Sequence, residues 1–104
     1  MPLHLYRLLG KLPVPVEDVN EWGEWFATAD RLVGVDLIEG WVVSTVFLGI
    51  DYNFLNPGNP HLFETMVFDR EGHEQACERC STWEQAQHLH QAVLAETRSR
   101  IRQP

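Results

Sequence analysis

The chain has 104 residues and a formal net charge of −7, from 15 acidic and 8 basic residues. Its length fits one domain spanning residues 1–104, and 44% hydrophobic with 22% charged residues is typical of a folded globular protein. The negative charge argues against direct binding to nucleic acid, which requires a basic surface. It indicates either simple solubility or an acidic surface that suits a protein partner.

Targeting and export signals are not expected. No apolar run approaches the roughly 20 residues that cross a bilayer, and the N-terminal stretch lacks the pattern of a signal peptide. The two cysteines are too few for a disulfide scaffold. We therefore expect a cytoplasmic protein without membrane contact.

The N-terminal segment has weak local signals. Residues 3–9 fit either a short strand or a turn of helix, because periodicity does not decide so short a run. Pro13 and Pro15 then predict irregular structure over residues 11–15.

A helix is expected over residues 16–30. Asp18 can cap its first turn, with Glu21 three residues later as in a capping box. Val19, Trp22 and Phe26 recur at helical spacing and predict one apolar face.

The middle of the chain reads as strands. Residues 31–38 predict a first strand, and Glu39-Gly40 a tight turn into a second strand over residues 41–51. That second strand is apolar on both alternating faces. Such a strand is covered on both sides or contacts another subunit, and the second case predicts a homodimer.

A long loop over residues 51–61, rich in Asn, Pro and Gly, separates this strand from a third one over residues 62–69. Glu64 stands between Leu62 and Met66 on one face of the third strand, where a carboxylate needs a partner. Residues 74–80 are polar enough for an edge strand.

The last helix has the clearest start signal. Ser81 followed by Glu84 matches a capping box. Its expected buried stripe is Ala86, Leu89, His90, Val93, Leu94, Thr97 and Ile101. The pattern as a whole predicts an α+β fold, in which a three- to four-stranded antiparallel β-meander is flanked by an N-terminal and a C-terminal α-helix.

Glu64, His90 and Asp51 form the most interesting polar set. If His90 faces the sheet and Glu64 faces that helix, the two could form a general acid/base pair or a structural pair, and the structural pair is favoured. No nucleophile motif or phosphate-binding Gly loop accompanies them. We therefore predict no catalytic residue.

Neither of the two ligand-like patterns in the sequence predicts a metal site. Cys77 and Cys80, with His88 and His90, supply zinc-type ligands, but neither pair converges on a regular strand or helix. The loop after Asp51 lacks the acidic alternation of a calcium loop. We predict neither a metal nor a cofactor. Among the four tryptophans, Trp25 and Trp41 are the better candidates for protein contacts.

Three segments carry a resemblance. STVFLGID at 44–51, LFETMVF at 62–68 and STWEQA at 81–86 are similar to a family of small uncharacterised phage, prophage and bacterial proteins, over about the C-terminal two thirds of the chain. This chain has Cys80 where the family often has an aromatic residue, and Leu89 where it tends to have Gly. A shared family site would fall on the matching positions Asp51, Asn53, Glu64, Thr65 and His90.

The favoured function is a small acidic, non-enzymatic protein-binding module, of the kind of a phage-type accessory protein that modulates a host protein in counter-defence. The motivation is the resemblance, the small size, the charge and the lack of catalytic motifs. The alternative is a small-ligand-binding or enzymatic domain that uses the region of Glu64, His90 and Asp51.

Overall fold

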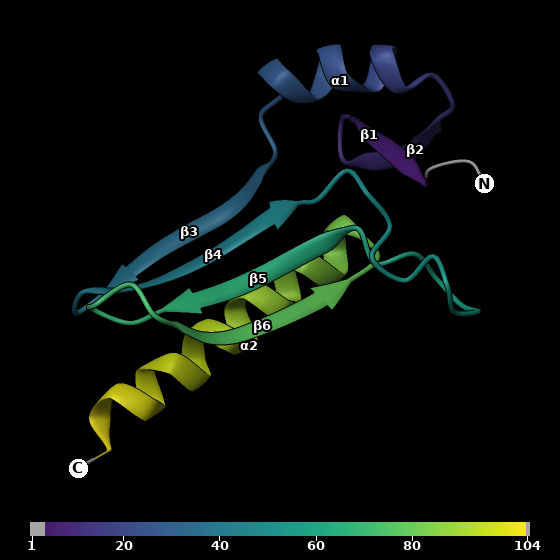
Figure 1. The fold of residues 1–104 in the computed structure, drawn as a ribbon. Coiled ribbons are helices and arrows are strands. Elements are labelled where there is room, and N and C mark those ends of the chain that lie inside the picture. The colour runs from purple at the N-terminus through teal and green to yellow at the C-terminus, as the bar shows by residue number, and fades with distance from the viewer. Residues whose placement is uncertain (1–3, 104) are drawn as a thin grey trace.

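The structure is a computed structural model that describes residues 4–103 (Figure 1). Within these residues the chain forms two antiparallel sheets, one of two strands and one of four, and two helices. The elements in chain order are β1 (Leu5–Leu9), β2 (Leu12–Val16), α1 (Val19–Thr28), β3 (Leu32–Ile38), β4 (Trp41–Phe47), β5 (Phe63–Phe68), β6 (Glu74–Cys80) and α2 (Trp83–Arg102).

The four-stranded sheet is a meander of order β3-β4-β5-β6, which confirms the predicted arrangement of strands. Its first connection is the predicted tight turn. Glu39 and Gly40 have φ of +48° and +87°, and two successive positive φ values define the turn type that matches the twist of a hairpin. β4 is shorter than expected, because the chain leaves the sheet after Phe47.

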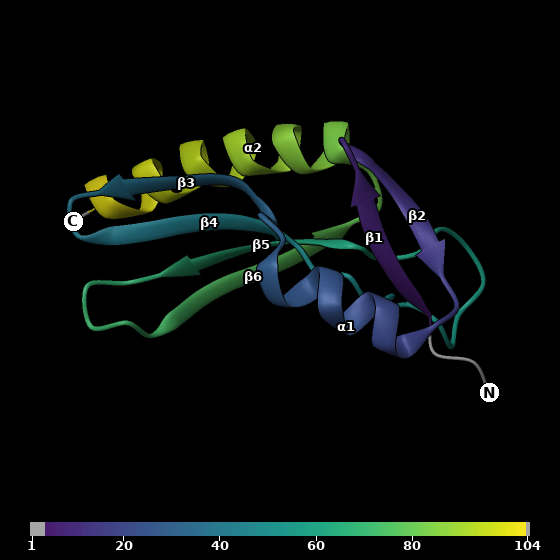
Figure 2. The same ribbon diagram turned by 90° about the horizontal axis from the view of Figure 1, so that it is seen from above.

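One side of this sheet packs on α2 (Figure 2). Alternate residues of the two central strands are buried beneath the helix, among them Val43, Phe47, Phe63 and Val67. The predicted helical stripe meets them. Its members Ala86, His90, Val93, Leu94 and Thr97 are buried, and Leu89 and Ile101 are half-buried.

The start of α2 differs from the prediction by one residue. Thr82, not Ser81, is the N-cap, and Gln85 closes the capping box by accepting from the N–H of Thr82. Two overlapping matches, Ser81 with Glu84 and Thr82 with Gln85, fit the same motif.

The prediction of irregular structure around Pro13 and Pro15 is wrong, because both lie in β2, which pairs with β1. They pair with Leu8 and Tyr6 in a hairpin closed by a two-residue turn. In that register the backbone nitrogens of both prolines point away from β1, so no ladder hydrogen bond is lost.

The first helix, α1, follows the β1–β2 hairpin and precedes β3. The predicted N-terminal helix is therefore present but is not the first element of the fold. Asp18 caps it as predicted, accepting from the N–H groups of Asn20 and Glu21. Trp22 of α1 donates its indole N–H to the carbonyls of Tyr6 and Gly49, at 2.9 and 3.1 Å. These bonds join the hairpin and α1 to the end of the main sheet.

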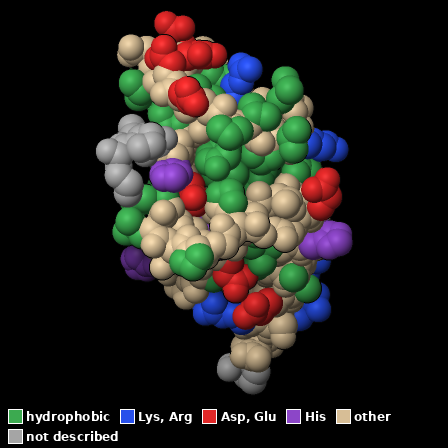
Figure 3. Space-filling model, turned by 90° about the vertical axis from the view of Figure 1, so that its right-hand side faces the viewer, with side chains coloured by type: hydrophobic (Ala, Val, Ile, Leu, Met, Phe, Trp, Pro, Cys, Tyr) green, Lys and Arg blue, Asp and Glu red, His purple; other side chains and the backbone are tan. Residues whose placement is uncertain are grey.

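Figure 3 views the side of the molecule that carries the hairpin and the loop after β4, and hydrophobic side chains gather in its upper half. Exposed apolar residues on these two segments include Leu9, Leu12 and Leu55. None of the helices among residues 4–103 has the length and apolar character to cross a bilayer.

Candidate functional site

A chain of four polar side chains runs through the layer between the sheet and α2. The carboxylate of Asp36 lies 2.7 Å from His90 Nε2, and His90 Nδ1 lies 2.7 Å from the hydroxyl of Thr45. That hydroxyl lies 2.6 Å from the hydroxyl of Thr65. Asp36, Thr45 and Thr65 come from three neighbouring strands and His90 from α2, so the chain of bonds crosses the sheet beneath the helix.

The burial of these four side chains decreases from the two threonines to Asp36. Thr45 and Thr65 are 0% and 1% exposed and His90 is 4% exposed, whereas the Asp36 side chain is 45% exposed. Gly34 lies against the imidazole, and a Cβ there would be in ordinary van der Waals contact with the ring at 3.5 Å. The network therefore connects the core to solvent only through the Asp36 carboxylate.

The Asp36 carboxylate fixes the direction of one bond, and the charge of His90 sets the direction of the other two. A carboxylate only accepts, so His90 Nε2 carries a proton and donates it to Asp36. With a neutral imidazole, Nδ1 accepts from Thr45 and Thr45 accepts from Thr65. With a charged imidazole, Nδ1 donates to Thr45, which can donate to Thr65. Both charge states of His90 leave every bond in the chain satisfied.

The structure separates Glu64 from this network. Glu64 lies on the opposite face of the sheet from Thr65 and His90, and its carboxylate accepts from Arg79 Nε at 2.9 Å. The expectation that Glu64 faces the last helix is wrong. The side-chain parity of β5 is set by Phe63, Thr65 and Val67, which take the buried face.

Asp51 and Asn53 form a separate pair at the base of the long loop. The buried Asp51 carboxylate accepts from the N–H groups of Asn53 and His61, at 2.7 and 2.9 Å. It thus holds the two ends of the loop together. Of the five predicted site residues, the structure brings together Thr65 with His90 through Thr45, and Asp51 with Asn53, and places Glu64 with neither group.

Two members of the network were missed from sequence. Thr45 stands between Val43 and Phe47 on the buried face of β4, and a hydroxyl in an apolar alternation was the available signal. Asp36 carried no such signal, because its partner is 54 residues away in sequence.

The second face of the four-stranded sheet is uncovered. In Figure 1 the strands pass in front of α2, and no element among residues 4–103 lies over their near side. We call this surface the open face. Its apolar members are Leu32, Val35, Leu37, Val42, Val46, Met66 and Phe68, of which Leu32, Val35 and Leu37 are 46%, 52% and 77% exposed.

Charged side chains are scarce on the open face. The strand positions that point to it carry only Glu64, Glu74 and Arg79. The Glu64–Arg79 pair is neutral, and the Arg79 guanidinium also stacks on the Tyr52 ring, 4.7 Å from its centroid. The acidic charge of the protein therefore lies elsewhere.

The two predicted contact tryptophans are half-buried. Trp25 meets the buried ring of Phe47 edge-on, with the ring centroids 6.0 Å apart. Trp41 lies beneath the Arg100 guanidinium, 5.6 Å from the ring centroid. Much of each ring is thus used for contacts within the chain.

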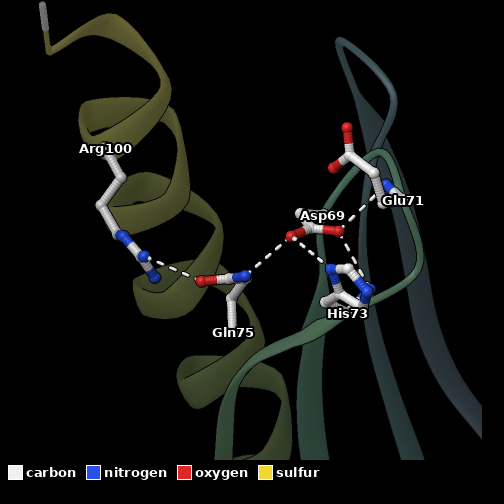
Figure 4. Close-up of polar contacts among 5 residues, drawn as sticks. All are labelled: Asp69, Glu71, His73, Gln75 and Arg100. Carbon is white, nitrogen blue, oxygen red and sulfur yellow. Dashed lines mark hydrogen bonds and ion pairs between the residues drawn. The ribbon is translucent and has the colours of Figure 1, made fainter.

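A second polar cluster closes the turn between β5 and β6 (Figure 4). Asp69 accepts from the N–H groups of His73 and Glu71 and from the side chain of Gln75, at 2.9, 3.0 and 2.8 Å. These donors, led by the N–H of His73, hold the pKa of the Asp69 carboxyl below its usual value. Gln75 accepts in turn from Arg100 of α2. The cluster thus ties the turn to the last helix.

The zinc-type residues do not converge. The side chain of Cys77 points to the open face and that of Cys80 to the opposite face, while His90 is buried and His88 exposed. Among residues 4–103, no group of three or more His, Cys, Asp or Glu could hold a metal ion. Burial raises the pKa of both thiols, and the neighbouring Glu64 raises that of Cys77 further.

No family model, no curated protein and no solved structure matches this chain.

Proposed function

We propose that this chain is a small acidic protein-binding module without catalytic activity of its own, and that the open face is its binding surface. The observation that carries the proposal is the exposure of Leu32, Val35 and Leu37 beside the apolar side chains of β4 and β5. Contiguous apolar surface of this kind marks interaction sites in proteins that are otherwise polar outside.

The occupant that fits the open face best is an amphipathic helix of a partner protein. The same strands already accept one such helix, α2, on their other face, through alternate residues such as Val43 and Val67. The open face repeats this arrangement with Val42 and Met66. A partner helix would complete a three-layer arrangement with the sheet in the middle.

Charge narrows the chemistry of the partner. With Glu64 and Arg79 paired, the open face is close to neutral in a protein of net charge −7. The partner helix that binds there would therefore have an apolar stripe and few basic residues. The resemblance of the three segments described above to phage-type proteins supports a host protein as the owner of that helix, in an accessory or counter-defence role.

The burial of the two hydroxyls of the network supports a non-enzymatic role. These hydroxyls, on Thr45 and Thr65, are 0% and 1% exposed, so no substrate can reach them while the chain is folded. The alternative function would need Glu64, His90 and Asp51 in one site, and these three side chains lie in three different environments.

Affinity capture from a host lysate, with two matched variants, tests the proposal. Met66→Glu places a charge on the open face, and Leu9→Glu places one on an exposed apolar residue of the hairpin, 63% exposed. We expect the wild type and Leu9→Glu to retain the same partner, and Met66→Glu to lose about tenfold or more of it. Circular dichroism verifies that both variants fold. Equal capture by Met66→Glu would refute the open face as the binding surface.

A further inference from the structure

The two edges of the main sheet differ in how they are protected. β6 carries Glu74, Glu78 and Arg79, and charged side chains on an edge strand discourage pairing with another chain. β3 has a single charged residue, Asp36, whose carboxylate is held by His90. Val35 and Leu37 are exposed beside it. Both edge ladders contain a register irregularity, so the β3 edge lacks only the charge protection that the β6 edge has.

The backbone of β3 leaves hydrogen-bonding groups free at this edge. Because the two-residue turn makes Ile38 and Trp41 a hydrogen-bonded pair, Asp36 and Gly34 also direct their N–H and C=O groups toward β4. The residues between them, Val35 and Leu37, direct theirs outward. β3 is the first strand in the order, so no strand among residues 4–103 receives these groups.

Space beside the edge is available on the side of the helix. A groove of about 340 Å³ lies between β3 and α2, and its lining includes Gly34 and Asp36 on the strand and Gln87, His88, His90 and Gln91 on the helix. A strand added to β3 would direct alternate side chains into this groove, and the others toward the open face.

We propose that the added strand is β3 of a second copy, paired antiparallel about a two-fold axis at Val35. In this register all seven residues of Leu32–Ile38 lie beside the second copy, because Val35 is the middle residue of the strand. Regular pairing runs from Gly34 to Asp36, since β3 has a register irregularity between Leu32 and Gly34. It places Asp36 opposite the partner copy's Gly34, which has no side chain.

The neighbouring registers are less favourable. A two-fold axis at Asp36 would place two carboxylates directly opposite each other, about 4.5 Å apart at Cα in a non-hydrogen-bonded pair. An axis at Leu37 would pair fewer residues of the strand. Like-charge repulsion and overlap therefore both select Val35.

The dimer would have a continuous eight-stranded sheet with two copies of the open face side by side. This inference goes beyond the proposed function and does not depend on it, since edge pairing leaves the open face uncovered. Dimerisation is measured by solution mass and the open face is tested by partner capture with Met66→Glu, a residue of β5 outside the β3 edge, so the two proposals can fail separately.

Disulfide trapping tests the register. In a Cys77→Ser, Cys80→Ser background, Val35→Cys places two thiols on residues about 5.5 Å apart at Cα, within the range of a disulfide. Leu37→Cys is the matched control. It lies on the same edge and is more exposed, at 77% against 52%, but the two copies of residue 37 would be about 14 Å apart along the strands.

We expect Val35→Cys to cross-link about tenfold faster than Leu37→Cys under mild oxidation, as proximity requires. Random collision would instead favour the more exposed Leu37→Cys. Equal rates, or faster cross-linking through Leu37→Cys, would overturn the register.

The mass in solution tests the pairing itself, and we expect the wild type to have twice the 12.0 kDa mass of one chain. Val35→Pro removes an outward N–H that β3–β4 pairing does not use, as Pro13 and Pro15 show to be tolerated in β2. We expect this variant to have half the mass of the wild type with an unchanged circular dichroism spectrum. Val35→Lys provides the same test if the proline variant does not fold. A monomeric wild type at tens of micromolar, or dimeric Val35→Pro and Val35→Lys, would overturn the proposal.

Discussion

The hydrogen bond between the buried hydroxyls of Thr45 and Thr65 predicts that substitutions at these two residues have non-additive effects on the free energy of unfolding. Thr45→Val is nearly isosteric, but it leaves His90 Nδ1 and the Thr65 hydroxyl without partners. Both residues are almost fully buried, and each unpaired buried polar group costs about 1–3 kcal/mol. We therefore expect Thr45→Val to lower the free energy of unfolding by about 2–4 kcal/mol.

Thr65→Val removes the last hydroxyl of the network and leaves Thr45 bonded to His90. We therefore expect it to lower the free energy of unfolding by about 1 kcal/mol. The double variant leaves only His90 Nδ1 unpaired. Its loss should be about 1–3 kcal/mol, no greater than that of Thr45→Val alone. Urea unfolding followed by tryptophan fluorescence measures all three variants. Additive losses, or a neutral Thr45→Val, would refute the network as described.

Three further outcomes are expected. Gly49→Ala should lower the free energy of unfolding, measured by heat or urea, by about 1–3 kcal/mol, because φ is +79° and the new Cβ would lie 3.2 Å from Trp22 and Phe26. Gly23→Ala in α1 should instead raise it by about 0.5–1 kcal/mol. The folded-state pKa of Asp69 is lowered, so its stabilisation is present above the unfolded pKa of about 4 and is lost as pH falls through the folded pKa. The stability gap between wild type and Asp69→Asn should therefore shrink between pH 5 and 2, and a constant gap would contradict this. Glu64→Gln should speed alkylation of Cys77 at pH 8 and leave Cys80 unchanged, because Glu64 raises only the pKa of Cys77.

Local chemistry explains where sequence patterns succeeded. The tight turn at Glu39-Gly40, the Asp18 cap and the stripe of α2 each depend on residues within one or two turns of each other, and the structure confirms all three. The alternation of β4 likewise revealed that both of its faces are apolar. It could not reveal that only one of them is covered within the chain.

The sequence alone therefore determined the strand order of the main sheet, the buried face of α2 and the Glu39-Gly40 turn, because periodicity and capping act over a few residues. The tertiary structure decided the rest. It put Pro13 in a strand by turning its nitrogen outward, assigned Glu64 to the open face through the parity set by Phe63, and joined Asp36 to His90 across 54 residues. Contacts between distant segments depend on how layers stack and which face is buried, and a single strand or helix does not contain that information.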